Sequence, residues 1–591
     1  MDGHISDGEA ATWLSEHGFS SISSRLDHGV SPLHVACKEG NLLVVEWLLR
    51  HGSDLSEQTT CEDGLSPFMF AARSNRGELL KWLVSVSECE YRVDMPLYLA
   101  KNKKGSTALM YAAEGSDLEV VQWLVEIGSD LSARNRKGST VAMWSTSNRN
   151  LGVLQWLEAQ GSGMDEVNEE GMSLFSFSAL EGRIDVMEYL LSRNASLLRR
   201  NSAGMTPFLL AVRYGRIEAM DWLLKHGASI KDANGRGAGA MLLAAQSGHV
   251  HALDWLCSQG CSVHDLSENG CTAIMYAADS GRIPAIDWLV KHGADVHQRS
   301  PLGTTAVMFA AMNGHTKTVE WLHCEYACNI AAQNRHRCTA LHLAAEEGHL
   351  ESTKWLIAHG VDELLRAGPN HKSPLMLAAE AGHLPIVQYL LQERQHGTNA
   401  WNPAHNLEAF TLAASRGRVK VLEWMYLHLP PDALLSSHSS LPNQPAALIA
   451  LHCAARSGSL NSIKWLHRHG VDINARTDSN NNTAAIMAAA GGHLATLKWL
   501  IMHGADITLF SSSRKSVWKT SEGTPSIRNW LQSTFGAILS PLIVSDSDSD
   551  SDVEFDEEVF DDDGSESEDD DEHDYNYDTD SGTDDSGDEQ D

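Results

Sequence analysis

The sequence predicts an all-α fold made of stacked helical repeats, followed by a disordered acidic tail. The first observation is a tryptophan that recurs at intervals of 33 to 35 residues over most of the chain. The second is that most intervals contain two short apolar segments, each ended by a glycine, which is typical of a helix pair. The third is an abrupt change to acidic residues at about residue 545.

The tryptophans set the register of the repeats, and two longer intervals of 41 residues mark insertions. A single unit cannot bury its own apolar face, so each unit is stabilised by its neighbours. We expect about fourteen units after one half unit. The register positions are Trp13, Trp47, Trp82, Trp123, Trp156, Tyr189, Trp222, Trp255, Trp288, Trp321, Trp355, Tyr389, Trp424, Trp465 and Trp499.

Residues 338–362, "CTALHLAAEEGHLESTKWLIAHGVD", show how one unit is built. Thr339 is expected to cap the first helix, and Gly348 to end it in a left-handed conformation. His349 then begins the second helix, which Gly360 closes. The same pattern recurs at residues 31–55, "SPLHVACKEGNLLVVEWLLRHGSDL".

On these motifs the chain resembles the ankyrin-repeat family, over about residues 9–507. The resemblance implies an ankyrin solenoid of helix-turn-helix units with β-hairpin tips. It implies that partners dock on a concave face lined by the tips and first helices. It also implies that His342 makes structural hydrogen bonds within and between repeats.

The repeat pattern divides the chain into six expected regions. The repeats before the loop contain an insertion at 85–101 and a degenerate unit near 139–170, which we expect to be a soft point or a bend. The regions are a half repeat or cap at 1–26, units one to twelve at 27–428, a Pro/Ser-rich loop at 429–446, units thirteen and fourteen at 447–507, a C-terminal cap at 508–544 and the acidic tail at 545–591.

A cluster of cysteines and histidines between residues 323 and 342 is a weak candidate for a metal site. Zinc prefers four nitrogen or sulfur ligands. The repeat register accounts for two of the side chains, so we favour a structural interpretation and expect no metal. The candidate ligands are Cys324, Cys328, His336 and Cys338. The ten cysteines show no paired spacing, which favours free thiols in a reducing compartment.

No catalytic or cofactor motif is found: there is no P-loop, no nucleophile elbow, no zinc-protease helix and no kinase set. We therefore expect no enzyme activity and no cofactor. The sequence shows no signal peptide and no apolar run long enough to span a membrane. We expect a monomer located in the cytoplasm, the nucleus or both.

The tail at 545–591 contains 25 Asp and Glu and no Lys or Arg, against a net charge of −33 for the whole chain. Such a segment cannot collapse, and it favours either a solubilising role or attraction of basic proteins. Leu542, Ile543 and Val544, followed by acidic residues, resemble a SUMO-interacting motif. Acidophilic kinases would favour the serines Ser545, Ser547, Ser549 and Ser551.

The predicted tips are rich in basic residues, which makes them candidates for partner binding. One hypothesis is that the acidic tail folds back on these tips. Nucleic acid is not expected as a partner, because the chain is acidic and carries no binding motif. The candidate residues are Lys103, Lys104, Arg136, Lys137, Arg199, Arg200, Arg236, Arg299, Arg335, Arg337 and Lys372.

The functional prediction is a non-catalytic scaffold or adaptor that binds other proteins, extended or basic ones among them, on the concave face. Two alternatives stay open: a chaperone or escort of histones or ribosomal proteins that uses the tail, and a substrate receptor for a ubiquitin ligase. The second needs an adaptor-binding box, which we do not find after residue 508. The resemblance also makes Asn474, in "LHRHGVDIN", a candidate for asparagine hydroxylation.

Overall fold

The computed structural model describes residues 5–61, 63–89, 95–393, 403–428, 446–476 and 480–535. The chain divides into two parts, Met1–Ile527 and Arg528–Asp591, and the helix pairs lie in the first part. The tail, the SUMO-like motif and nearly all of the Pro/Ser-rich loop lie outside the described residues.

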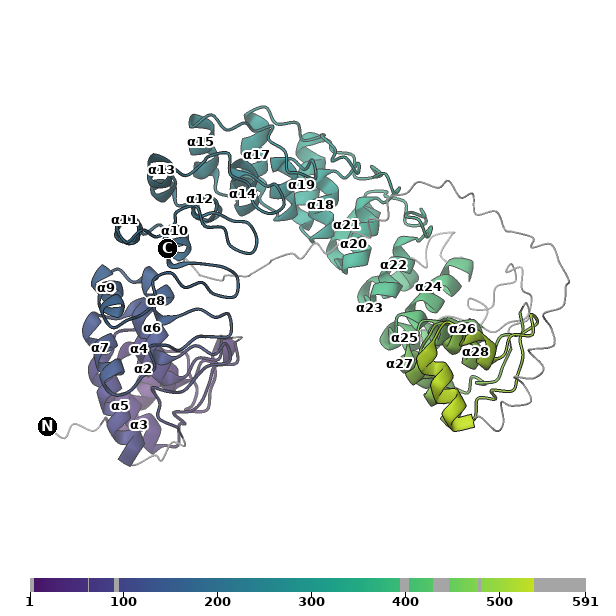
Figure 1. Ribbon diagram of the computed structural model, residues 1–591, viewed down its shortest axis with the longest axis horizontal. Coiled ribbons are helices and arrows are strands. Elements are labelled where there is room, and N and C mark those ends of the chain that lie inside the picture. The colour runs from purple at the N-terminus through teal and green to yellow at the C-terminus, as the bar shows by residue number, and fades with distance from the viewer. Residues whose placement is uncertain are drawn as a thin grey trace. The chain divides into compact units, whose positions relative to one another are not determined.

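The described residues contain the fourteen helix pairs that the sequence predicts (Figure 1). Repeat four is shortened, because its first helix, α8 (Val141–Trp144), continues as a single 3₁₀ turn, η2 (Ser145–Ser147). The first helices of the other repeats are α2 (Pro32–Glu39), α4 (Pro67–Arg73), α6 (Ala108–Gly115), α10 (Leu174–Glu181), α12 (Pro207–Arg213), α14 (Ala240–Ser247), α16 (Ala273–Asp279), α18 (Ala306–Met312), α20 (Ala340–Glu347), α22 (Pro374–Ala381), α24 (Pro403–Ser415), α26 (Ala446–Arg456) and α28 (Ala484–Ala490).

The second helices of the pairs carry the register tryptophans. In repeat eleven the second helix continues as a π-helical turn, η3 (Tyr389–Glu393). These helices are α3 (Leu42–Arg50), α5 (Gly77–Cys89), α7 (Leu118–Glu126), α9 (Leu151–Ala159), α11 (Ile184–Ser192), α13 (Ile217–Lys225), α15 (Val250–Ser258), α17 (Ile283–Lys291), α19 (Thr316–Tyr326), α21 (Leu350–Ala358), α23 (Leu384–Gln388), α25 (Val419–His428), α27 (Leu460–Arg468) and α29 (Leu494–Met502).

The first helices pack against one another in chain order, and each also packs against the second helix of its own repeat. The close approach follows from their alanines, such as Ala344 and Ala345, which are fully buried. Across the Pro/Ser-rich loop, α24 packs directly against α26 and α25 against α27, so the helix stack continues there.

The local signals in the repeat motif act as the sequence predicts. Thr339 is the N-cap of α20, its hydroxyl lying 2.9 Å from Nδ1 of His342. Gly348 ends α20 with a φ of 90°, a left-handed conformation that glycine adopts without strain. His349 is the N-cap of α21.

Repeat four is the place where two clusters of the buried core meet. Val141 and Val153 belong to the cluster that begins at Trp13, whereas Ala142 and Leu154 belong to the cluster that extends to Val361. Its missing glycine turn is replaced by Asn148, whose side-chain amide donates to the carbonyls of Ala113 and Ser116 at 3.0 and 2.8 Å.

The expected β-hairpin tips are reduced in the structure, because no strand is present in the described residues. Instead, tips close through isolated antiparallel bridges between residues five or six apart, such as Lys101 with Thr107 and Arg134 with Thr140. The tips are too short to form more than one such bridge.

The two ends of the array are helical. Before repeat one lie α1 (Asp7–Glu16) and a 3₁₀ turn, η1 (Asp27–Gly29). After repeat fourteen, α30 (Val517–Thr520) packs on α28, and residues 525–535 are helical. The insertion after repeat two begins as an extension of α5, which reaches Cys89.

Candidate partner-binding surface

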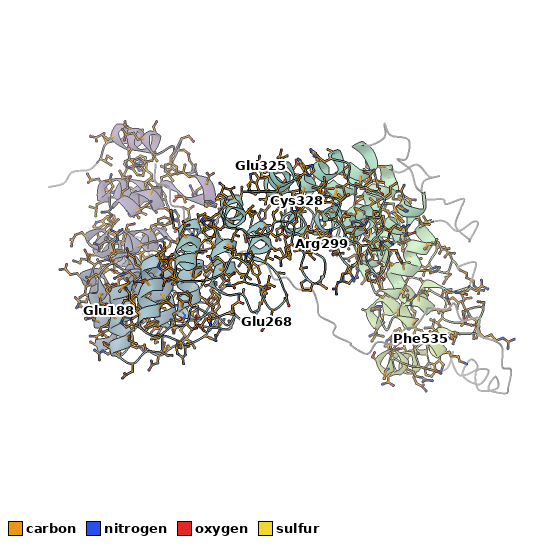
Figure 2. All side chains as sticks on the ribbon, turned by 90° about the horizontal axis from the view of Figure 1, so that it is seen from above. Glu188, Glu268, Arg299, Glu325, Cys328 and Phe535 are labelled. Carbon is orange, nitrogen blue, oxygen red and sulfur yellow. The ribbon has the colours of Figure 1, made fainter. Side chains whose placement is uncertain are left out.

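Main-chain hydrogen bonds connect successive tips. The amide of Arg136 donates to the carbonyl of Lys104 at 2.8 Å, and the amide of Glu169 donates to the carbonyl of Lys137 at 2.9 Å. At Pro301 such a bond is impossible, since proline has no N–H. Figure 2 labels Glu268 and Arg299, which lie in the two tips on either side of that step.

Many of the basic tip residues are engaged with a neighbouring tip. Lys103 donates to the carbonyls of Thr59 and Cys61 at 3.2 and 3.1 Å. Ion pairs join Lys104 to Asp63 at 2.5 Å and Lys137 to Glu170 at 3.0 Å, whereas Lys372 pairs at 2.5 Å with Glu380 on the first helix of its own repeat. Arg199, Arg200 and Arg299 donate to the carbonyls of Asp165, Ala233 and Gln333.

The other basic tip residues remain available. Among the described residues, no hydrogen bond or ion pair engages the guanidinium groups of Arg136, Arg236, Arg335 and Arg337. Sequence analysis therefore identified a basic edge. It could not distinguish the side chains that bind a neighbouring tip from those whose guanidinium groups make no such contact in the described part of the chain.

A second feature of this surface is a set of carboxylates at the C-terminal ends of first helices. Glu114 ends α6 beside Gly115, Asp279 ends α16, and Glu346 and Glu380 occupy the last turns of α20 and α22. The negative end of a helix dipole disfavours a carboxylate at these positions. Sequence analysis assigns them no functional role and interprets Glu346 as solvated surface, although the four share one register position in the repeat.

These carboxylates differ in how far hydrogen bonds and ion pairs offset their negative charge. Arg73 forms an ion pair with Glu114 at 3.0 Å, but the other carboxylate oxygen of Glu114 is buried without a hydrogen-bond partner. Asn313 donates to Asp279 at 2.8 Å. Glu380 receives Lys372 at 2.5 Å and Arg416 at 3.0 Å.

The pKa values follow from this pattern. Burial raises the pKa of Asp279 to about 6, although hydrogen bonds from Asn313 and Gln246 favour the charged form. Burial also raises the pKa of Glu114 and of Glu346. Burial acts in the same direction on Glu380, but Lys372 and Arg416 outweigh it and lower the pKa of that carboxyl.

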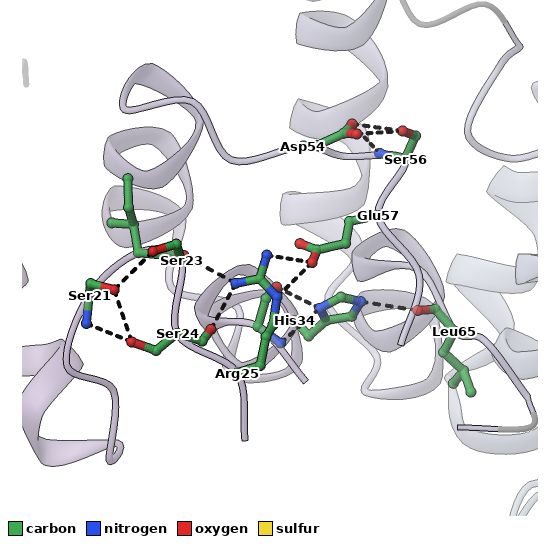
Figure 3. A network of polar contacts seen from close by, with 11 residues as sticks. Ser21, Ser23, Ser24, Arg25, His34, Asp54, Ser56, Glu57 and Leu65 are labelled. Atoms are coloured by element: carbon green, nitrogen blue, oxygen red, sulfur yellow. Dashed lines mark hydrogen bonds and ion pairs between the residues drawn. The ribbon is translucent and has the colours of Figure 1, made fainter. Parts of the chain in front are cut away.

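The motif histidines hold repeats together, as the resemblance implies. Nε2 of His342 lies 3.0 Å from the carbonyl of Leu365 in the next repeat. His34 makes the same contact to the carbonyl of Leu65 at 3.0 Å (Figure 3). Its Nδ1 lies 2.7 Å from the hydroxyl of Ser31. Burial lowers the pKa of both histidines, so the neutral ring is favoured.

The tryptophans have two sets of partners that the sequence did not reveal. A histidine four residues later stacks on the indole, as His292 does on Trp288 at 3.8 Å. The indole N–H donates to a carboxylate of the preceding second helix, from Trp288 to Asp254 at 2.7 Å and from Trp222 to Glu188, labelled in Figure 2, at 3.3 Å. The acidic residue before many register positions is the signal for this contact.

The residues in and around the candidate metal site differ in burial and in their local contacts. Nδ1 of His323 lies 3.1 Å from the carbonyl of Cys328, while Cys324 is exposed. Burial raises the pKa of Cys328 to about 11 and also raises that of Cys338. In the part of the chain that the structure describes, no three His, Cys, Asp or Glu side chains are grouped so as to hold a metal ion.

Asn474 bridges repeats thirteen and fourteen. Its amide donates to the carbonyl of Gly504 at 2.8 Å, and its side-chain oxygen accepts from the amide of Asp506 at 2.8 Å. Hydroxylation of Asn474 remains a prediction, and it would modify a side chain that already makes two hydrogen bonds. The SUMO-like motif and the four serines cannot be placed, because they lie outside the described residues. Among the described helices, none has the length and apolarity to cross a membrane.

Comparisons with known proteins bear on the whole array. A family model described as "Ankyrin repeats (3 copies)" matches residues 4–95, 33–135, 97–167, 142–234, 230–300, 294–367 and 359–434. A second, "Ankyrin repeats (many copies)", matches residues 451–501. Alpha-latroinsectotoxin-Lt1a of Latrodectus tredecimguttatus is 32% identical over 103 residues, 17% of this chain. That match spans only 7% of the toxin's length.

Proposed function

Because the chain belongs to the ankyrin-repeat family, we propose that it is a non-catalytic scaffold that binds other proteins on its tips and first helices. The partner is an extended protein segment that carries spaced basic residues. The observation that carries this proposal is the set of carboxylates at the ends of α6, α16, α20 and α22.

Asp279 is the strongest member of this set. A carboxyl group whose pKa is raised to about 6 is still mostly ionised at pH 7, so its burial destabilises the folded protein. Groups that are retained at such a cost in stability are often functional. A lysine or arginine of a partner would relieve this cost at Asp279, and the exposed carboxylate of Glu346, at the same register position, is open to the same pairing.

The test is a selection from a library of linear peptides against the full-length protein. We expect enriched peptides with lysine or arginine at regular spacing, and a loss of at least about ten-fold in affinity in Asp279→Asn/Glu346→Gln, corresponding to about 1.4 kcal/mol. Glu218→Gln, on the second helix α13, is the matched control. Equal affinity of all three proteins would reject binding at this surface.

The composition of residues 545–591 favours one alternative, an escort of basic proteins that are held by the tail. Its 25 acidic residues provide long-range attraction without a defined surface. The same titrations separate the two functions, because tail-driven binding is unaffected by Asp279→Asn. Such binding disappears when the tail carboxylates are replaced by amides.

A further inference from the structure

The second helices of the last two repeats differ in charge from the earlier ones. Every second helix from α3 to α21 carries at least one Asp or Glu, and so does α25. The short α23 carries no charged residue, whereas α27 and α29 carry Lys or Arg without any Asp or Glu. Residues 446–535 contain nine Lys and Arg against four Asp and Glu, in a chain whose net charge is −33. The C-terminal end of the repeat array is therefore basic, although the whole chain is acidic.

This basic end contains a shallow depression of about 450 Å³ between α27 and α29. It is lined by Lys464, His467 and Arg468 of α27, and by Trp499 and His503 of α29. His503 stacks on Trp499 at 3.9 Å, and His467 meets the same indole edge-on at 5.7 Å. Within the described residues, neither Lys464 nor Arg468 forms an ion pair. The depression thus joins aromatic faces with available positive charge.

Among the described residues, this depression lacks an acceptor for the indole N–H of Trp499, which earlier repeats provide for their own tryptophans. In two earlier repeats the indole N–H donates to a carboxylate of the preceding second helix, from Trp222 to Glu188 at 3.3 Å and from Trp288 to Asp254 at 2.7 Å. For Trp499 the corresponding residue is Lys464, which has no acceptor. A carboxylate brought from elsewhere would accept the indole N–H and pair with Lys464 at the same time.

The chain itself contains a segment of matching chemistry. Residues 552–563, "DVEFDEEVFDDD", combine eight acidic residues with Phe555 and Phe560. The sixteen residues 536–551 that connect it to the described chain can extend over roughly 50 Å. That length is several times the roughly 8–10 Å that separates packed helices, so the connection is long enough to pass along more than one repeat.

We propose that residues 552–563 dock in the depression between α27 and α29. Their carboxylates pair with Lys464 and Arg468, one of them accepts the N–H of Trp499, and the phenylalanines contact the Trp499 and His503 rings. Docking reduces the tail charge that is available to basic proteins, because part of the tail is then bound to the protein's own surface. The surface belongs to second helices, and the proposal is independent of the carboxylates on the first helices.

A zero-length carbodiimide crosslink between a tail carboxylate and Lys464 tests the proposal in the full chain. We expect crosslinks from residues 552–563 to Lys464 at a yield at least about five-fold above those to Lys354. Lys354 is the matched control, because it also precedes a register tryptophan but pairs with Glu351 at 3.4 Å. A mixture of isotopically light and heavy protein identifies the crosslinks that form within one chain.

Two variants and one change of solvent complete the experiment. Arg468→Glu and Trp499→Phe should each lower the crosslink yield several-fold, while circular dichroism verifies that both proteins fold. Raising the salt from about 0.1 M to about 1 M shortens the Debye length from about 10 Å to about 3 Å and should have the same effect. Crosslinks spread evenly over the lysines of the tips, or a yield unchanged in both variants, would overturn the proposal.

Discussion

At the scale of single residues, buried ionisable groups make the stability of this protein depend on pH in two opposite directions. A carboxyl group whose pKa is raised on folding destabilises the folded state once it ionises. A histidine whose pKa is lowered destabilises it once it becomes protonated. Asp279 and His452 are the clearest example of each, and each leads to a prediction.

Asp279→Asn should stabilise the protein at pH 7 by about 1–3 kcal/mol, because the pKa of Asp279 rises from an ordinary value of 3.8 to about 6. The gain should be complete above pH 6 and should vanish as the pH falls towards 3.8. Urea unfolding at several pH values measures it. A stabilisation that is independent of pH would mean that Asp279 is not the source.

His452→Met should make the protein less sensitive to acid. Burial lowers the pKa of His452 from 6.5 to about 4, so the wild type should lose up to about 3 kcal/mol as the pH falls from 6.5 towards 4. Methionine is a suitable replacement, because Met275 and Met308 occupy the same register position and are buried. The urea midpoint of the variant should therefore vary less over this pH range than that of the wild type, although the hydrogen bond from His452 to the carbonyl of Ala475 is lost.

At the scale of helices, the register tryptophans join one second helix to the next. Trp288 is 8% exposed, stacks on His292 and donates to Asp254. Trp288→Ala should therefore destabilise the protein by roughly 3–5 kcal/mol. Trp288→Phe keeps a ring but loses the N–H, so it should cost distinctly less, and equal losses in both variants would contradict the assigned role of ring packing.

Repeat four gives a second prediction at this scale, because the two core clusters meet there. Asn148→Ala removes both hydrogen bonds to repeat three and should destabilise that junction by about 1–3 kcal/mol. Hydrogen exchange should become faster in α8 and α9 than elsewhere. Asn313→Ala, which loses a polar contact in repeat nine, is the control, and an equal response at α8 would remove the special role of Asn148.

The sequence predicts the helices well because their signals are local: Thr339, Gly348 and the spacing of the tryptophans lie within one repeat. At the tips the described residues show single antiparallel bridges, such as Lys101 with Thr107, in place of the strands of a hairpin. Sequence analysis also did not identify the carboxylates of the proposed binding surface, because only contacts with Gln246 and Asn313 of the neighbouring repeats distinguish Asp279 from other polar helix residues. Contacts between repeats determine which charges are neutralised, and a single repeat does not contain that information.

At the scale of the whole molecule, charge is distributed unevenly along the chain. Residues 545–591 carry 25 acidic residues without a basic one, whereas residues 446–535 have an excess of Lys and Arg. Two polyvalent segments of opposite charge in one chain attract each other with a strength set by salt. Under the proposed docking, a basic protein that binds the tail competes with the protein's own basic surface.

This competition gives the last prediction. Lys464→Glu/Arg468→Glu should increase the affinity of the full chain for a basic protein, with core histones as the probe, by about three-fold to ten-fold, or up to about 1.4 kcal/mol. The increase should fade at about 1 M salt, where charges more than about 3 Å apart are screened. The control is Lys354→Glu, which changes a lysine at the same register position outside the basic surface. If both proteins gain equally, net charge alone explains the effect; if neither gains, the tail is not held by α27 and α29.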